Sequence, residues 1–230
     1  VLYMHDGQNC FLAEYCSYGV PWDVQSALGR LAAAGEVEPA IIVAAWSIGP
    51  LRHLEYQPAR PFLYLSSHAR RRILTGLGGR PRSDSYLAFI VEELKPFIDT
   101  HYRTRPDRAH TAIMGSSMGG LISLYAICEY PDVFGAAGCV STHWPAVEGV
   151  IVPYLGEHLP DPATHRIYFD FGTETLDALY RPTQMLVDDL MLAVGYEPNV
   201  NWITRVFPDA RHFEADWAAR VHIPIKFMLS

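Results

Sequence analysis

The sequence predicts an α/β fold, with a mostly parallel sheet of about six strands and helices on both faces. Short apolar runs rich in β-branched and aromatic residues alternate with segments that have helical spacing or turn residues. A glycine-rich turn between an apolar run and a longer apolar segment adds a strand–turn–helix unit. The predicted strands are 1–5, 41–45, 110–115, 136–141, 167–171 and 201–207.

Two segments between these strands are predicted to be amphipathic helices. In 83–102, Ser83 or Asp84 can cap the helix, and Pro96 should kink it or split off its last turn. The second helix should begin with a proline, carry one apolar face and stop at a glycine. Its marker residues are Pro182, Leu186, Leu190, Val194 and Gly195.

The segment 49–82 is rich in Pro, Gly and Arg and lacks clear periodicity. It is too long for a plain connection, and long loops in compact domains are often functional or mobile. Its arginines fit a solvated surface. Alternatively, they form a wall of a binding site that attracts acidic groups of a substrate.

Size and charge restrict the class of protein. The 230 residues, half of them apolar, predict one domain over 1–230. A net charge of -7 and a pI near 5.8 argue against partners such as nucleic acid or an anionic membrane.

No apolar run approaches the roughly 20 residues of a membrane span, and no signal peptide is recognisable. A cytoplasmic location is favoured. The chain begins at Val1 rather than Met, so secretion after removal of an upstream segment stays open.

The four cysteines show neither a CxxC pair nor a zinc-like spacing with histidine, so we expect no metal site. Cys128 and Cys139 lie in apolar surroundings and are expected to be small buried side chains. Cys10 and Cys16 share a loop and could form a disulfide in an oxidising compartment.

The glycine-rich turn fits the G-x-S-x-G pattern of a nucleophile elbow, with Gly115 and Gly119 around Ser117. A serine at the apex of a strained turn projects its hydroxyl into a cleft. Glycines two positions before and after it remove side chains that would collide with the backbone. The helix that follows directs its free N–H groups at charge developing on a substrate oxygen. Ser116 lacks the apex position.

A serine hydroxyl needs a base, and the base needs a carboxylate that holds its tautomer. In this arrangement the acid and the histidine each follow a later strand, in that order. Glu174 and Asp177 follow the strand 167–171, and spacing alone does not choose between them. Of the ten histidines, His212 follows the last strand at its C-terminal end and is the candidate base.

An oxyanion hole needs two convergent backbone N–H groups. One should come from Met118, the residue after the nucleophile, and the other from Gly7 or Gln8 in the loop after the first strand. In that loop Asp6 and Asn9 either stabilise the backbone locally or, for Asn9, contact substrate. Further candidates for contact with substrate are aromatic residues after two strands, although ordinary core packing explains them as well. They are Trp22, His143 and Trp144.

Several segments together resemble the putative esterase family of α/β-hydrolases, which includes S-formylglutathione hydrolases, feruloyl esterases and siderophore esterases. They are "VLYMHDGQNCF", "YLAFIVEELKPFIDTHYRT", "AIMGSSMGGLISLYAICEYPDVFG", "IYFDFGTETLDALY" and "FPDARHFEADWAARVHIPIKFML". The resemblance implies an α/β-hydrolase fold, with Ser117 as nucleophile and His212 as base. It favours Asp177 over Glu174, because the nearest branch carries a G-T-x-x-L-D loop.

The sequence departs from this family at its start, since members carry further strands before the "YMHDGQN" strand. The family's strand order would then leave the apolar run 40–46 at an open sheet edge. Such an edge favours pairing with another chain, so a homodimer or aggregation is expected. The same order places the first strand beside the third while the second leaves in the opposite direction, which brings the "HDGQN" and "GSSMGG" loops to one crevice.

These observations favour a serine ester hydrolase that acts on a small-molecule ester through an acyl-enzyme, without a cofactor. Acyl transfer to an alcohol would use the same three residues and differ by excluding water. A catalytically inert binding module on a hydrolase scaffold is the alternative from another class.

Overall fold

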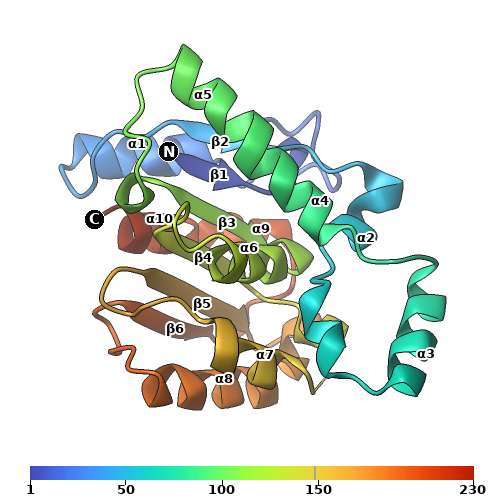
Figure 1. Ribbon diagram of the computed structural model, residues 1–230. Coiled ribbons are helices and arrows are strands. Elements are labelled where there is room, and N and C mark those ends of the chain that lie inside the picture. Colours follow the sequence, from blue (N-terminus) through green and yellow to red (C-terminus); the bar gives the residue numbers. More distant parts are fainter. Residues whose placement is uncertain (148) are drawn as a thin grey trace.

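The computed structural model describes residues 1–147 and 149–230 and confirms the predicted α/β fold. Six strands form one sheet in the order β2-β1-β3-β4-β5-β6, and every neighbouring pair is parallel (Figure 1). Each strand overlaps one of the six predicted runs. The strands are β1 (Leu2–Met4), β2 (Ile42–Ala44), β3 (Ala112–Ser116), β4 (Ala136–Val140), β5 (Arg166–Gly172) and β6 (Trp202–Phe207).

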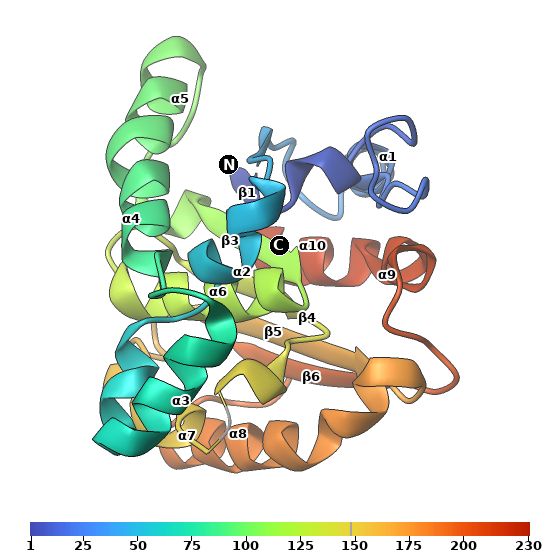
Figure 2. The same ribbon diagram turned by 90° about the vertical axis from the view of Figure 1, so that its right-hand side faces the viewer.

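Helices cover both faces of the sheet (Figures 1 and 2). Because side chains alternate along a strand, Tyr3 and Ile113 enter the core of one face and Met4 and Met114 that of the other. The first core is completed by α6 (Met118–Glu129), α7 (Ile151–His158) and α8 (Arg181–Ala193). The second is completed by α1 (Val24–Ala33), α9 (Glu214–Arg220) and α10 (His222–Leu229).

The predicted helix over 83–102 forms, but the backbone near Pro96 differs from the prediction. It runs as α4 (Ser83–Ala88), a π-helical segment η4 (Phe89–Leu94) and α5 (Lys95–His101), and follows one continuous rod in Figure 1. Pro96 therefore does not split off the last turn. The π-helical segment lies just before the proline, where a regular hydrogen-bond pattern would otherwise be interrupted.

The predicted cap of this helix is wrong. Arg82 precedes the first turn, and no side chain caps it. The Ser83 hydroxyl instead accepts a hydrogen bond from the Ala59 amide, and the Asp84 carboxylate accepts one from the Tyr125 hydroxyl. Both polar side chains thus connect α4 to other elements.

In α8 the helix is confirmed, but its predicted face is only partly right. Val187 and Met191 are fully buried, whereas Leu186 is exposed and Leu190 is half-buried. The buried row is shifted by one residue because the sheet contact, rather than apolarity alone, selects the face. The helix ends before Gly195, whose φ of 95° is left-handed, as the sequence predicts.

The segment 49–82 contains short helices that periodicity did not indicate. In Figure 1 the part of this segment around α3 (Ser67–Leu77) projects from the main body at the right of the view. Arg71 and Arg72 are exposed, as predicted for a solvated surface, and Arg52 lines a pocket described below. Attraction of acidic substrate groups by these arginines stays a prediction. The helices are η2 (Gly49–Leu51), α2 (Arg52–Glu55), η3 (Arg60–Tyr64) and α3 (Ser67–Leu77). Other short turns are η1 (Gly7–Asn9), η5 (Arg108–His110), η6 (Trp144–Val147) and η7 (Thr175–Leu179).

The cysteines are free thiols. Cys128 and Cys139 are buried, as predicted, and Cys10 and Cys16 are not bridged to each other. No helix in the described ranges is both long enough and apolar enough to span a bilayer.

Close approach of backbone segments decides which glycines are needed at the turn after β3. A Cβ on Gly115 would lie 2.8 Å from the Gly119 carbonyl carbon, and one on Gly120 would lie 2.9 Å from the Val140 oxygen. A Cβ on Gly119 would meet only ordinary contacts at 3.5 Å. The sequence predicts that both glycines of the motif prevent collisions with the backbone, and this holds for Gly115 alone. The second position at which a side chain would collide with backbone is Gly120.

We therefore expect Gly120→Ala to lower the free energy of unfolding by about 1–3 kcal/mol, because neighbouring backbone must shift. Gly119→Ala should change it by less than about 1 kcal/mol, since alanine also favours the helix that begins here. Urea unfolding of both variants measures the difference. Equal destabilisation would contradict the steric argument.

Strand β2 lies at one end of the sheet, as predicted. Dimerisation through it stays a prediction, which sedimentation velocity over a range of concentrations can test. Ala45 donates its amide to β1, so the amide of Ala44 faces the open side. We expect the wild-type chain to self-associate and Ala44→Pro, which removes that outward donor, to weaken association. A wild-type monomer at every concentration would contradict this prediction.

Candidate active site

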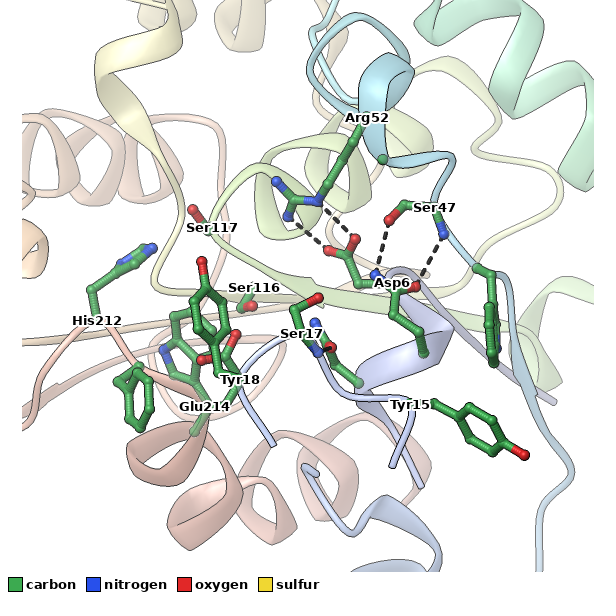
Figure 3. Close-up of a pocket in the computed structure, with 16 residues that line it drawn as sticks. Asp6, Tyr15, Ser17, Tyr18, Ser47, Arg52, Ser116, Ser117, His212 and Glu214 are labelled. Carbon is green, nitrogen blue, oxygen red and sulfur yellow. Dashed lines mark hydrogen bonds and ion pairs between the residues drawn. The ribbon is translucent and has the colours of Figure 1, made fainter. Parts of the chain in front are cut away.

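Ser117 occupies the turn between β3 and α6 in a strained backbone conformation, with φ 58° and ψ -122°. In the sheet, β1 lies between β2 and β3, so the chain leaves β1 toward one side for β2 and returns to the other side for β3. The turn lies at this reversal of direction, and ligands commonly bind at such switch points. Ser117 is half-buried and lines a pocket of about 570 Å³ together with Ser116 and His212 (Figure 3). Its hydroxyl is therefore accessible to a ligand.

His212 and Asp177 form a short hydrogen bond in which His212 Nδ1 donates to Asp177 Oδ1 at 2.6 Å. Asp177 lies in η7 after β5, and His212 follows β6, so both come from the carboxyl edge of the sheet. The His212 amide donates to Thr175 Oγ1 at 2.8 Å and holds the loop in place. In Figure 3 the imidazole lies on the same side of the pocket as Ser117.

Among the described residues, His212 is bonded neither to Ser117 nor to the second candidate carboxylate. In the described chain no hydrogen bond of 3.5 Å or less joins the Ser117 hydroxyl to His212. Glu174, the other carboxylate considered, is exposed, and its side chain accepts only from the neighbouring Thr173 hydroxyl, at 3.4 Å. The structure thus pairs His212 with Asp177 and leaves Glu174 in solvent.

Asp177 is fully buried and accepts two further hydrogen bonds, from the Ser141 hydroxyl and the Gly172 amide, each at 2.6 Å to Oδ2. Burial by itself would raise the pKa of Asp177. The hydrogen bonds from His212, Ser141 and Gly172 outweigh burial and hold that pKa below its ordinary value. Asp177 therefore stays ionised, as a partner for imidazolium requires.

A buried polar network supports Ser141, and sequence reasoning missed it. Ser141 Oγ accepts hydrogen bonds from Trp217 Nε1 at 2.9 Å and Arg220 Nη2 at 3.0 Å. Arg220 also forms a buried ion pair with Asp170 on β5. No motif marks these residues. The one available signal was that Ser141 directly follows β4, at the same sheet edge as the other site residues.

Tyr180 is a second residue that the sequence did not single out. Its buried hydroxyl lies 2.9 Å from His143 Nδ1 and 3.4 Å from His212 Nδ1. Burial raises the pKa of Tyr180, so the hydroxyl keeps its proton. Burial also lowers the pKa of His143 to about 4, and nearby positive charge adds to this effect. Near neutral pH His143 is thus an uncharged neighbour.

The backbone amides of Gly7 and Gln8, the two candidates for the second oxyanion-hole donor, differ in whether they are free to bind a ligand. The Gly7 amide donates to the Ala45 carbonyl at 2.8 Å and is not free to bind a ligand. The Gln8 amide lies in the first turn of η1 and has no backbone acceptor among the described residues. Gly7 has another role, because a Cβ there would lie 2.4 Å from the Ala44 oxygen. Met118 is the first residue of α6, where an amide lacks an intrahelical partner.

Two of the predicted substrate contacts belong to the core instead. Trp22 packs against Trp217, and Trp144 against Phe169, and neither indole lines the pocket. Burying their large apolar surfaces outweighs placing them at the site. His143 lines a separate smaller pocket next to Met118. Asn9 does line the main pocket, and its side chain also accepts the Ser17 amide at 2.9 Å.

The rest of the pocket wall combines charge and aromatic rings. Asp6 is bound by Arg52 through two hydrogen bonds of 2.7 Å each, rather than stabilising only its own loop. Gln8 is held by two hydrogen bonds to Ser47. Aromatic rings pair at the rim as Tyr15 with Trp46 and Tyr18 with Phe213, and Glu214 contributes a further carboxylate.

Comparisons with known proteins agree with this fold. The chain is 30% identical over 161 residues to the ferri-bacillibactin esterase BesA of Bacillus subtilis, covering 63% of this chain and 48% of that protein. It is 32% identical over 92 residues to the uncharacterised protein YbbA of the same organism, covering 39% of this chain and 35% of that one. The chain thus spans less than half the length of these two relatives.

Solved structures share the fold over nearly the whole chain. A ferulic acid esterase matches with a TM-score of 0.67 and 22% identity, covering 99% of this chain and 84% of that one. The enterobactin esterase of Shigella flexneri matches with a TM-score of 0.67 and 19% identity, covering 99% and 52%. The family model described as "Putative esterase" matches residues 1–219. The chain therefore belongs to the putative esterase family.

Proposed function

We propose that this chain is a serine carboxylic ester hydrolase that acts on a small-molecule ester through an acyl-enzyme on Ser117. The observation that carries the proposal is the 2.6 Å bond between His212 and the buried Asp177 in the pocket that Ser117 lines. Membership of the esterase family supports it, as do relatives that are themselves named as esterases. The nature of the acyl and alcohol groups is a separate question.

In the first step His212 acts as general base through Nε2, the ring nitrogen that Asp177 leaves free. Asp177 holds the Nδ1–H tautomer and stabilises the imidazolium that forms. Ser117 Oγ attacks the ester carbonyl, and its proton passes to His212. The bond between Ser117 and His212 closes in the substrate complex, as catalytic hydrogen bonds often tighten on binding.

The tetrahedral oxyanion is stabilised by the amides of Met118 and Gln8, with the N-terminus of α6 adding its dipole. His212 then returns its proton to the leaving alcohol, which leaves an acyl group on Ser117. Water, activated by the same imidazole, hydrolyses this ester and restores the free serine. The reaction uses no redox step, and each proton that His212 takes it later returns.

Replacing Ser117 tests the proposal directly. We expect wild type to hydrolyse members of a panel of p-nitrophenyl and methyl hydroxycinnamate esters, and Ser117→Ala to lose at least about 10³-fold in kcat. A fluorophosphonate probe should label wild type and not the variant. Equal hydrolysis by both folded proteins would refute a role for Ser117, and an unreactive wild type would favour the inert binding module.

The two neighbouring carboxylates offer a matched pair of variants. Asp177→Asn keeps the shape but no longer holds the reactive tautomer of His212, so kcat should fall by about 10³- to 10⁴-fold. Glu174→Gln should leave kcat within about twofold, because an exposed side chain without contact to the imidazole has little influence. Steady-state kinetics of both proteins decide the matter, and the reverse ranking would show that Asp177 is not the orienting acid.

A further inference from the structure

Glu214 is a buried carboxylate whose one hydrogen bond among the described residues comes from its own backbone amide. It lies in the first turn of α9, is 5% exposed and lines the same pocket as Ser117. In Figure 3 it overlaps with Tyr18 in the view, in the half of the pocket that also holds His212 and Ser116. In the described residues no hydrogen bond or ion pair of another side chain reaches its oxygens. A buried charge is normally compensated by such contacts.

The nearby cations are paired with other carboxylates and offset this charge only in part, since His212 and Arg52 each act to lower the pKa of Glu214. Arg52 is engaged by both oxygens of Asp6, and Arg211 is paired with Asp216. His212 donates to Asp177. Burial is the largest influence on Glu214 and raises its pKa above the ordinary value, although its own backbone amide, His212 and Arg52 act in the opposite direction. When Glu214 is ionised, the pocket thus holds one negative charge that the other lining residues offset only in part.

Two aromatic pairs line the rim of the pocket, and in Figure 3 Tyr18 lies in the same part of the view as Glu214 whereas Tyr15 lies at the opposite end. Tyr18 and Phe213 pack at 6.0 Å, and Tyr15 and Trp46 at 5.4 Å, and all four line the pocket. The faces of such rings attract cations. A hydroxyl group of a substrate could donate one hydrogen bond to Glu214 but would leave the buried charge uncompensated. An alkylammonium group would both compensate the charge and contact the rings.

We propose that Glu214, Tyr18 and Phe213 form a subsite for a positively charged alkylammonium group of the ester substrate. The inference deepens the proposed hydrolase function and rests on it. The subsite selects esters that carry a cation within reach of the scissile carbonyl and disfavours those with a carboxylate at that place. Glu214 is accordingly a specificity-determining residue and takes no part in the proton transfers.

Two esters of nearly the same shape test the subsite: butyrylcholine, which is cationic, and 3,3-dimethylbutyl butyrate, which is neutral. We expect wild type to prefer the cationic ester at least about tenfold in kcat/KM. Glu214→Gln should reduce this preference at least about fivefold, mainly through a higher KM for the cationic ester. Glu93→Gln, the same change at an exposed surface position, is the matched control and should keep the wild-type preference.

An unchanged preference in Glu214→Gln, or a wild type that prefers the neutral ester, would overturn the inference. A 4-hydroxybutyl butyrate arm, compared with pentyl butyrate, reports on hydroxyl groups. A higher kcat/KM for the hydroxylated ester than for pentyl butyrate, without a preference for the cationic ester, would also overturn the inference.

Binding without turnover separates this inference from the proposed function. Calorimetry should detect butyrylcholine binding to Ser117→Ala, at least about tenfold weaker binding to Ser117→Ala/Glu214→Gln, and no such loss with Ser117→Ala/Glu93→Gln. If wild type hydrolyses neither ester, the hydrolase proposal fails for these substrates while the calorimetry still decides the subsite. Equal binding of butyrylcholine by Ser117→Ala and Ser117→Ala/Glu214→Gln would refute the proposed subsite.

Discussion

The organisation of the site depends on the compensation of one buried negative charge, that of Asp177. Removing an ionised carboxylate from water costs several kcal/mol, which close hydrogen bonds must offset. Asp177 has three of them, each 2.6 Å long, from a side chain after β4, an amide at the end of β5 and an imidazole after β6. One carboxylate thereby joins the ends of three neighbouring strands and orients His212.

The network behind Asp177 extends this principle to a second buried charge. Asp170 and Arg220 compensate each other, and Arg220 and Trp217 both donate to the Ser141 hydroxyl that in turn donates to Asp177. Because Ser141 has two donors directed at its oxygen, its own proton is directed at the carboxylate. Helix α9 and the end of β4 therefore help to hold the hydrogen-bonded pair of Asp177 and His212 in place.

Glu214 illustrates the opposite condition in the same cavity. It lies three residues after Arg211, whose guanidinium pairs with Asp216, and among the described residues no other side chain donates a hydrogen bond to it. Asp177 is compensated from within the protein, and its pKa is lowered; Glu214 is not, and its pKa is raised. This contrast distinguishes a carboxylate that serves the protein's own imidazole from one that is available to a ligand.

Patterns local in the sequence determined much of this protein. The six strands, the glycine-rich turn at Ser117 and the position of His212 after the last strand follow from residue order and apolar periodicity, because those features arise within a few neighbouring residues. Packing between distant segments decided the rest. It selected Asp177 over Glu174 by burial, engaged the Gly7 amide with β2, moved Trp22 and Trp144 into the core and brought Tyr180, Ser141 and Arg220 to the site. These outcomes depend on which groups lose water together, and that is a property of the folded chain rather than of any one segment.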